Sequence, residues 1–291
     1  MATEQQVVLS GWGNYPTANS YVTMPSDAEE LNRIITPGQV IARGLGRSYR
    51  DQAIHTHKKV CICTRLHHFL SWDEKEGILE CEAGTSLDEI ITTFAPRGWM
   101  PMICPGTKFI TIGGAIANDI HGKAHHADGS FINCVISFTI LLSDGRIVTA
   151  SRETNPDLFI ANFGGLGLLG IILTAKIRLR KIETTYFRQL SVKVNNLDEM
   201  LDALEQYKDR NYSVAWIDPL ATGKRLGSGV LTVGDAATMD ELPASLKKDP
   251  LKIHRISRLN VPFFLPGFAL NNISVRLLNR MIGFVQNSPR P

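Results

Sequence analysis

Three glycine-rich segments carry the pattern in this chain that is best suited to chemistry. They are Arg43 to Tyr49, Pro105 to Thr107 and Thr111 to Ala115. Each exposes backbone N–H groups beside glycines, which have no side chain to block an approaching ligand. Successive N–H groups of this kind form a concavity that binds anions. Three such loops in order, with His121 close behind the last, predict a dinucleotide whose diphosphate is held by backbone amides.

Three imidazoles and one amine follow the third segment, at His121, Lys123, His125 and His126. Histidines at these spacings can bind zinc, but the surrounding glycines argue against a regular helix that would align them. We therefore favour contacts of the histidines with a bound cofactor or substrate over a metal site. Lys123 either contacts a phosphate or substrate oxygen or is simply solvated.

The segment Gly165 to Gly170 matches the G-x-G-x-x-G pattern of dinucleotide-binding loops. That pattern forms a Rossmann phosphate site only where a strand precedes it and a helix follows it. Here Ile171 to Leu179 follows, and this run is rich in β-branched residues and alternates polar with apolar positions. The pattern favours a glycine-rich turn that leads into a strand lying against a flat ligand.

Two further features have competing interpretations. Cys61 and Cys63 lie on one face of a predicted strand, and buried packing is favoured over redox use because no cation beyond Lys58 and Lys59 is adjacent. Trp216 either forms the wall of a substrate pocket or is a core aromatic residue on a strand.

The order of the elements that must position these residues predicts an α+β fold. Helix-start signals occur at Ser26, Ser86 and Asn196, and strand-like runs lie at 40–42, 59–63, 78–82, 135–142, 147–150 and 170–180. Asp144-Gly145 predicts a hairpin turn. The pattern indicates a small parallel βαβ layer, about 1–65, packed against a larger and mainly antiparallel part, about 66–182.

The character of the sequence changes after Lys181. Strand-like 186–194, a helix from Asn196 and strand-like 213–217 predict a separate α+β domain at 183–291, with loops from Pro219 onward. We found no internal repeat.

Length and composition restrict the class of protein. The chain has 291 residues, 44% hydrophobic residues and a net charge of +3, which is typical of a globular protein and argues against nucleic acid as a partner. The five cysteines show no disulfide framework, which, without a signal peptide, indicates a cytosolic compartment. The apolar stretch 261–268 is too short to span a membrane, and a loop packed on the core is favoured over contact with lipid or an apolar substrate.

The glycine segments, together with 116–123 and Ala215 to Asp218, resemble the FAD-linked oxidases of the vanillyl-alcohol-oxidase type. The resemblance extends from about Val8 to Gln286, and it is strongest to the branch that acts on polyprenyl-phosphate pentoses. It implies a two-subdomain FAD-binding fold of the PCMH type at 1–182 and a partial substrate cap at 183–291.

The resemblance also implies site residues. The positions that would line FAD are Arg43, Gly44, Leu45, Gly46, Arg47, Ser48, Tyr49, Arg50, Asp51, Gln52, Ala53, Gly106, Thr111, Ile112, Gly113, Gly114, Asn118, Asp119, Ile120, His121 and Ile172. Lys123 and Trp216 would contact the substrate. Many relatives attach the flavin to a histidine of the first glycine loop, and because this loop has none, we expect FAD to be bound without a covalent link. Arg50 stands where close relatives have glycine.

The expected function is that of an FAD-dependent oxidoreductase that oxidises a sugar hydroxyl to a ketone. Relatives continue beyond the position of Pro291, and the family base lies in that continuation, so no catalytic base is assigned and the chain is expected to be a truncated product. Family resemblance implies a lipid-linked sugar substrate, a short-chain reductase as partner and a cytoplasmic location with peripheral membrane contact. The alternatives are oxidation of another alcohol, such as an alditol or aldonolactone, and a non-catalytic FAD-binding protein.

Overall fold

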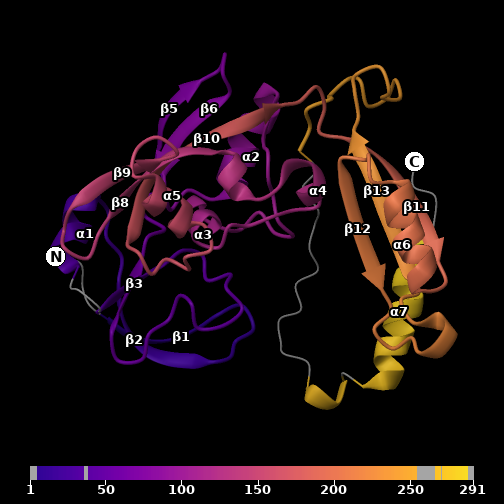
Figure 1. Ribbon diagram of the computed structural model, residues 1–291, viewed down its shortest axis with the longest axis horizontal. Helices are drawn as coiled ribbons and strands as arrows, with labels where there is room; N and C mark the ends of the chain where they lie inside the picture. Colours follow the sequence, from indigo (N-terminus) through magenta and orange to yellow (C-terminus); the bar gives the residue numbers. More distant parts are fainter. Residues whose placement is uncertain (1–4, 36–38, 254–265, 270, 288–291) are drawn as a thin grey trace. The chain divides into compact units, whose positions relative to one another are not determined.

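The computed structural model describes residues 5–35, 39–253, 266–269 and 271–287. Helices and sheets are mixed along the chain, which confirms the predicted α+β class. The chain divides into two compact units, Met1–Ile182 and Glu183–Pro291, which are described one at a time (Figure 1).

The first unit begins with a four-stranded sheet. In spatial order its strands are β1 (Gln5–Ser10), β2 (Thr17–Thr23), β4 (Lys59–Ile62) and β3 (Val40–Arg43). Strands β2, β4 and β3 are parallel, as the sequence predicts, whereas β1 pairs with β2 in an antiparallel hairpin. The small layer is therefore a mixed sheet and not a purely parallel one. The sequence-based assignment did not include the β1–β2 hairpin.

Helix α1 (Ala28–Ile34) connects β2 to β3 and begins one residue later than the Ser26 signal predicts. Its N-cap is Asp27, whose carboxylate accepts a hydrogen bond from the Glu30 amide at 2.7 Å. Ser26 instead donates its amide and hydroxyl to the Glu30 carboxylate. The two adjacent capping residue types made the start ambiguous in the sequence.

A larger antiparallel sheet follows, and strand β10 is at its centre. Its spatial order is β5 (Phe69–Asp73), β6 (Ile78–Glu82), β10 (Ile171–Lys181), β8 (Val135–Leu141) and β9 (Ile147–Ser151), with β7 (Trp99–Pro101) added along the end of β10. The predicted Asp144-Gly145 turn joins β8 to β9, and Gly145 has a φ of +85°, where glycine is favoured.

Three helices cover this sheet and close its core. They are α2 (Leu87–Phe94), α3 (Ile112–Ala117) and α5 (Pro156–Asn162) (Figure 1). Their apolar side chains join those of β6, β8 and β10 in one buried cluster that includes Phe94, Ile116, Phe138, Phe159 and Ile177. Helix α2 begins at the predicted capping box on Ser86. The short helix α4 (His125–Asp128) lies beyond α3.

A second buried cluster joins the two sheets of this unit. It combines Leu31 of α1 and Cys61 of β4 with Leu141 of β8 and Leu173 of β10. Since these residues come from both sheets, the loops that leave β3 and β4 are held beside the turn that leads into β10. The position of those loops determines where a ligand can bind.

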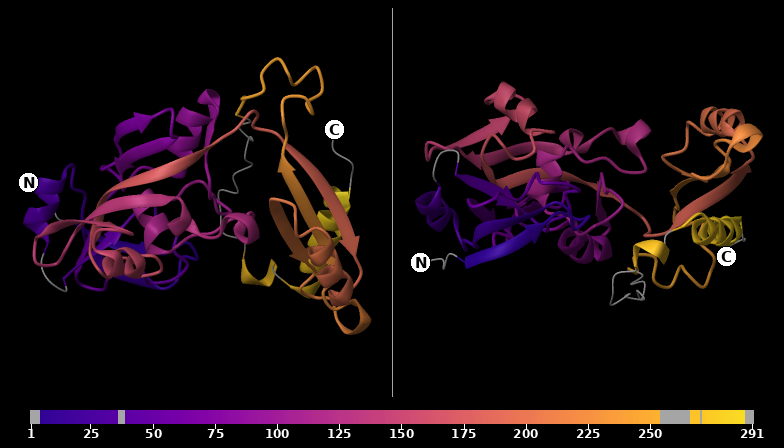
Figure 2. Two further views of the ribbon diagram at one scale, coloured as in Figure 1. Left: turned by 45° about the horizontal axis from the view of Figure 1, so that its top comes forward. Right: turned by 90° about the horizontal axis from the view of Figure 1, so that it is seen from below.

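The second unit is a three-stranded antiparallel sheet between helices. Strand β13 (Gly229–Ala236) lies between β11 (Phe187–Val194) and β12 (Tyr212–Ile217). Helices α6 (Leu197–Gln206) and α7 (Asn272–Asn287) flank the sheet on opposite faces (Figure 2). The region after Pro219, predicted to be rich in loops, also contains the central strand and α7, which the sequence-based assignment missed.

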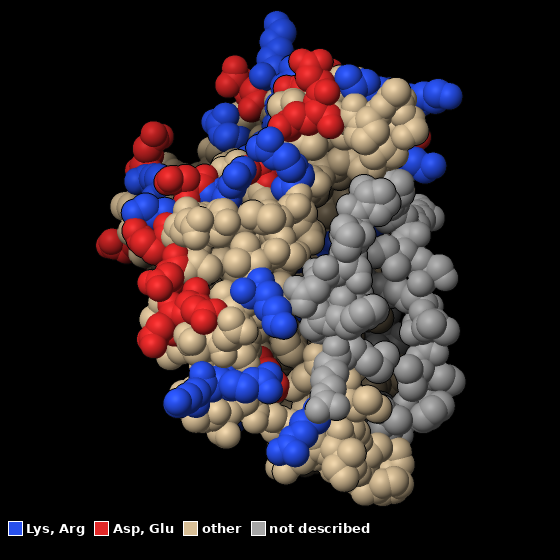
Figure 3. All heavy atoms as spheres, turned by 90° about the vertical axis from the view of Figure 1, so that its right-hand side faces the viewer, with Lys and Arg blue, Asp and Glu red and all other residues tan. Residues whose placement is uncertain are grey.

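On the face drawn in Figure 3, basic and acidic side chains are interspersed. No helix among the described residues is both long and apolar enough to cross a membrane. Residues 261–265 of the predicted lipid-contacting stretch lie outside the described residues, whereas Phe268 is described and is 82% exposed.

The capping box of α2 generates a prediction on pH. Although burial acts to raise it, the pKa of Glu89 is lowered overall by hydrogen bonds from the Ser86 side chain and backbone, and by His67. A lowered carboxylate pKa stabilises the fold above about pH 4.5, and this stability is lost as the pH falls through the folded-state value. We expect Glu89→Gln to be less stable than wild type at pH 7, with a difference that narrows towards pH 4 in denaturant titrations. A difference that widens towards acid would contradict this assignment.

Candidate functional site

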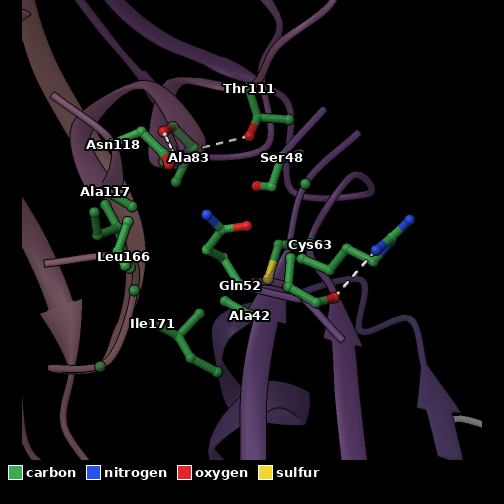
Figure 4. A pocket seen from close by; sticks show the side chains of 18 residues that line it. Ala42, Ser48, Gln52, Cys63, Ala83, Thr111, Ala117, Asn118, Leu166 and Ile171 are labelled. Carbon is green, nitrogen blue, oxygen red and sulfur yellow. Dashed lines mark hydrogen bonds between the residues drawn. The ribbon is translucent and has the colours of Figure 1, made fainter. Parts of the chain in front are cut away.

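An open cavity lies where the two sheets of the first unit meet (Figure 4). Its walls come from the loop after β3, the start of α3 and the turn before β10. The lining residues are Ala42, Arg43, Gly44, Ser48, Gln52, Ala53, Cys63, Ala83, Thr111, Gly113, Gly114, Ala117, Asn118, Leu166, Gly167, Gly170, Ile171 and Ile172. A concave lining that is mainly apolar, with a few polar side chains, is typical of a small-molecule or cofactor site.

The first and third glycine segments meet at one close contact. A Cβ atom on Gly44 would lie 2.3 Å from the Thr111 hydroxyl oxygen. Thr111 is the N-cap of α3 and accepts a hydrogen bond from the Gly114 amide at 3.2 Å. Glycine at position 44 is therefore required for the loop after β3 to lie against the helix start.

The backbone amides of these two segments differ in their availability. At the start of α3, the amides of Ile112, Gly113 and Ala115 donate to carbonyl oxygens of Thr85, Ala83 and Thr111. This segment therefore does not offer the free amides that the sequence suggested. From Gly44 to Tyr49, in contrast, no amide donates to an acceptor in the described part of the chain. The first loop is the one that can bind an anion through its backbone.

Arg43 fixes both ends of this first loop. Its half-buried guanidinium donates to the Ser10 carbonyl oxygen at 2.7 Å and to the Ala53 carbonyl oxygen at 3.1 Å. Burial lowers the pKa of Arg43 from its ordinary value. Gly46 has a φ of +66°, and a Cβ there would lie 2.4 Å from the guanidinium. The loop thus wraps closely around the arginine side chain.

The outer side of the same loop is fixed by Trp12 and Arg47. The Trp12 amide donates to the Ser48 carbonyl oxygen at 2.7 Å. The Arg47 guanidinium lies 4.8 Å from the centre of the Trp12 ring and donates to the Phe109 carbonyl oxygen. Phe109, which follows the second glycine segment, therefore supports the loop from outside, and Gly106 itself does not line the cavity.

Gln52 reaches the middle of the cavity with its carboxamide (Figure 4). Its side-chain oxygen accepts a hydrogen bond from the Arg50 amide at 3.2 Å. The side-chain NH₂ group is therefore the part of Gln52 that can donate to a ligand.

The structure gathers part of the predicted set around the cavity. The lining includes the predicted residues Arg43, Gly44, Ser48, Gln52, Ala53, Thr111, Gly113, Gly114, Asn118 and Ile172. It does not include Leu45, Gly46, Arg47, Tyr49, Arg50, Asp51, Gly106, Ile112, Asp119, Ile120 or His121. Ile112 is fully buried in the core, and the Asp119 carboxylate accepts a hydrogen bond from the Ile132 amide.

Several lining residues were not predicted, and three of them come from the turn before β10. The unpredicted residues are Ala42, Cys63, Ala83, Ala117, Leu166, Gly167, Gly170 and Ile171. The G-x-G-x-x-G match at 165–170 was the available signal. It leads into strand β10 rather than a helix, so the Rossmann interpretation is excluded and the alternative of a turn feeding a strand is confirmed.

His121 and Lys123 lie on the segment between α3 and α4, and both are exposed. The rings of His121 and His125 are 4.9 Å apart. Within the described ranges, no group of three potential metal ligands occurs. Trp216 belongs to the second unit, where it is half-buried on β12 opposite Val230.

The thiols behave as packing groups. Cys61 and Cys63 are buried with their sulfur atoms 3.9 Å apart, and the pKa of Cys61 is raised by its hydrogen bond with Cys63 and by burial. Burial also raises the pKa of Cys81 and of Cys134 to about 12. Protonated thiols of this kind are poor nucleophiles, as the sequence predicts.

Comparison with known proteins shows a similarity to one class of domain. Residues 20–151, which include the free amides of the first loop and the start of α3, match the family described as the FAD binding domain. Residues 20–151 are therefore similar to an FAD-binding domain, and FAD is the cofactor that a domain of this kind binds.

Individual relatives are consistent with that class. The chain is 37% identical over 280 residues to decaprenylphosphoryl-β-D-ribose oxidase of Mycolicibacterium smegmatis, which covers 91% of this chain and 60% of the relative. It is 28% identical over 190 residues to cytokinin dehydrogenase 2 of Arabidopsis thaliana, covering 62% of this chain and 38% of the relative. It is also 28% identical over 171 residues to D-lactate dehydrogenase of Archaeoglobus fulgidus, covering 55% and 39%. The chain thus spans less than two thirds of the length of these relatives.

The contact between Gly44 and Thr111 generates a double-mutant prediction. Gly44→Ala should destabilise the fold by about 1–3 kcal/mol because its methyl group has no room beside the Thr111 hydroxyl. Thr111→Ala should cost about 1 kcal/mol through loss of the cap. In the double variant we expect a loss smaller than the sum by about 1 kcal/mol, since the hydroxyl that obstructs the methyl group is gone.

Denaturant unfolding of the four proteins measures this coupling. Gly106→Ala is the matched control and should leave the unfolding free energy unchanged, because a Cβ there meets no atom within 4 Å. Strictly additive losses for positions 44 and 111 would show that the two loops do not meet as described.

Proposed function

We propose that this chain is the FAD-binding part of an oxidoreductase that oxidises a hydroxyl of a lipid-linked pentose to a ketone. The observation that carries the proposal is the 37% identity over 280 residues to a decaprenylphosphoryl-ribose oxidase, a match that extends through both units. The cavity of the first unit supports it, because its glycine loop and apolar turn suit a nucleotide with flat rings.

The residues of the cavity would divide the work of holding the cofactor. The first glycine loop, whose Gly44 and Ser48 line the cavity, would bind the diphosphate through its backbone amides, since a diphosphate needs several donors and no side chain in the way. The buried Ile172 would pack against a ring, and the Gln52 amide would donate to a polar edge. The chemistry that FAD supplies when bound is acceptance of a hydride from the alcohol carbon.

We propose that the FAD is bound without a covalent link. No histidine lines the cavity within the described residues. Cys63 does line it, but its thiol is buried and directed at the Cys61 carbonyl oxygen.

Lys123 and His121 would contact the substrate outside this cavity. Both side chains are exposed and follow α3 directly, so they are accessible to a sugar phosphate. Lysine binds phosphate as a point charge, which suits a flexible polyprenyl-phosphate headgroup. Trp216 would offer an aromatic face to the substrate.

An absorbance spectrum of the purified chain tests the cofactor assignment. We expect a yellow protein whose flavin is released into the supernatant on acid precipitation, and whose colour bleaches when a prenyl-phosphate pentose is added without oxygen. Flavin that stays with the precipitate would contradict non-covalent binding. Bleaching by an alditol, aldonolactone or 2-hydroxy acid instead would favour another alcohol as substrate, and bound flavin that no alcohol reduces would favour a non-catalytic protein.

The role of Lys123 is tested by Lys123→Met. We expect the KM for the phosphorylated substrate to rise about tenfold, with kcat little changed, because a charge-assisted contact to the phosphate is lost. Lys75→Met, at an exposed turn between β5 and β6, is the matched control and should have no effect. An equal effect of Lys123→Met on a pentose without a phosphate would show that the lysine does not recognise that group.

The substrate also indicates partners. We propose that the ketone is passed to a short-chain reductase that returns it to an alcohol, and that the prenyl chain brings the protein to a membrane surface. Exposed apolar side chains of the second unit, among them Phe268, Ile273 and Leu277, support a peripheral contact. Consumption of a nicotinamide in a coupled assay and cosedimentation with lipid vesicles test these two points.

A further inference from the structure

Leu166 has a backbone conformation that leucine rarely adopts. Its φ is +55°, in the left-handed region. The other non-glycine residues with positive φ in the described ranges are Asn14, His57, Asp119 and Asn155. Asparagine, aspartate and histidine are the types that tolerate this region, whereas a leucine there is strained by its Cβ atom. Strain of this kind is retained where function needs it.

The strained conformation is held by hydrogen bonds of the turn before β10. The Leu166 amide donates to the Ala117 carbonyl oxygen at 2.8 Å, at the end of α3. The Leu168 amide donates to the Gly165 carbonyl oxygen at 3.0 Å. Gly164 and Gly167, on either side, also have positive φ. The chain thus uses glycine at the neighbouring left-handed positions but keeps leucine at 166.

The side chain of Leu166 contributes to the cavity wall. It lies beside Ala117 and on the same side of the cavity as that residue (Figure 4). It is 40% exposed, so much of its apolar surface is left uncovered. Leu168 in the same turn is 73% exposed and does not line the cavity. The protein itself buries only part of this apolar side chain, so its position towards the cavity contributes little stability to the free protein. A ligand in the cavity would bury the remaining apolar surface.

We propose that Leu166 is a cofactor-packing residue, kept as leucine despite its strained backbone because its isobutyl group covers apolar ring surface of bound FAD. The role of Leu166 rests on the FAD binding of the proposed function and is independent of which substrate is oxidised. Two separate claims follow, one about strain in the free protein and one about contact with the cofactor.

Thermal unfolding of the FAD-free protein tests the strain. Leu166→Ala and Leu166→Gly both remove the side chain and differ only in the Cβ atom. Because the left-handed backbone disfavours that atom, we expect the glycine variant to unfold about 2–4 °C above the alanine variant. The matched control is Leu168, whose φ is not positive, where the glycine variant should unfold below the alanine variant.

Titration with FAD, followed by quenching of flavin fluorescence, tests the contact. Both Leu166 variants should raise the Kd for FAD about tenfold, the order expected when half of a leucine side chain loses its apolar contact. Leu168→Ala and Leu168→Gly should stay within twofold of wild type. Added FAD should correspondingly raise the unfolding temperature of wild type more than that of the Leu166 variants.

Two results would overturn the proposal. A glycine variant at 166 that unfolds below the alanine variant would show that no strain is present, and an unchanged Kd for both Leu166 variants would show that the side chain does not meet the cofactor. A wild-type chain that binds no FAD would overturn this proposal and the proposed function together. A chain that binds FAD as expected but oxidises no alcohol would overturn the proposed function alone.

Discussion

The site depends on the contact between Gly44 and the hydroxyl of Thr111. The loop after β3 follows the smaller sheet, whereas α3 packs on the larger one. The absence of a side chain at position 44 lets the loop and the helix start touch. Thr111 is fixed in turn because its hydroxyl caps α3. Behind this contact, the buried cluster of Leu31, Leu141 and Leu173 holds the sheets together. The cavity is thus a product of how the sheets join.

The two glycine segments that look alike in the sequence do different things in the fold. Among the residues that the structure describes, the amides from Gly44 to Tyr49 have no acceptor, whereas those at the start of α3 donate to Thr85, Ala83 and Thr111. Glycine at 113 serves packing, because a Cβ there would lie 3.2 Å from the Ala83 side chain. A composition rich in glycine therefore marks close approach in general, and only the hydrogen bonds show which loop is open to an anion.

The sequence predicted those helices and strands that carry a strong local pattern. The Ser86 capping box and the alternating run of β10 are examples, and both are confirmed. Strand β13 was missed because Gly229 and Gly234 suggested loops. In the sheet, a Cβ at 229 would lie 1.9 Å from the Trp216 carbonyl oxygen, so glycine serves close packing between strands. The role of Leu166 was also missed, because no sequence pattern predicts a leucine in the left-handed conformation beside a cavity.

The hydrogen bonds around Arg43 and Trp12 have a practical consequence. Ser10 and Trp12 belong to the β1–β2 hairpin, yet their backbone groups bond directly to the Arg43 side chain and to Ser48. The amino-terminal hairpin is consequently a mechanical support of the nucleotide loop rather than an appendage. Peptide tags fused at that end, or proteolytic trimming into β1, would loosen the loop and leave preparations with variable flavin content, even though no residue of the cavity itself had been altered.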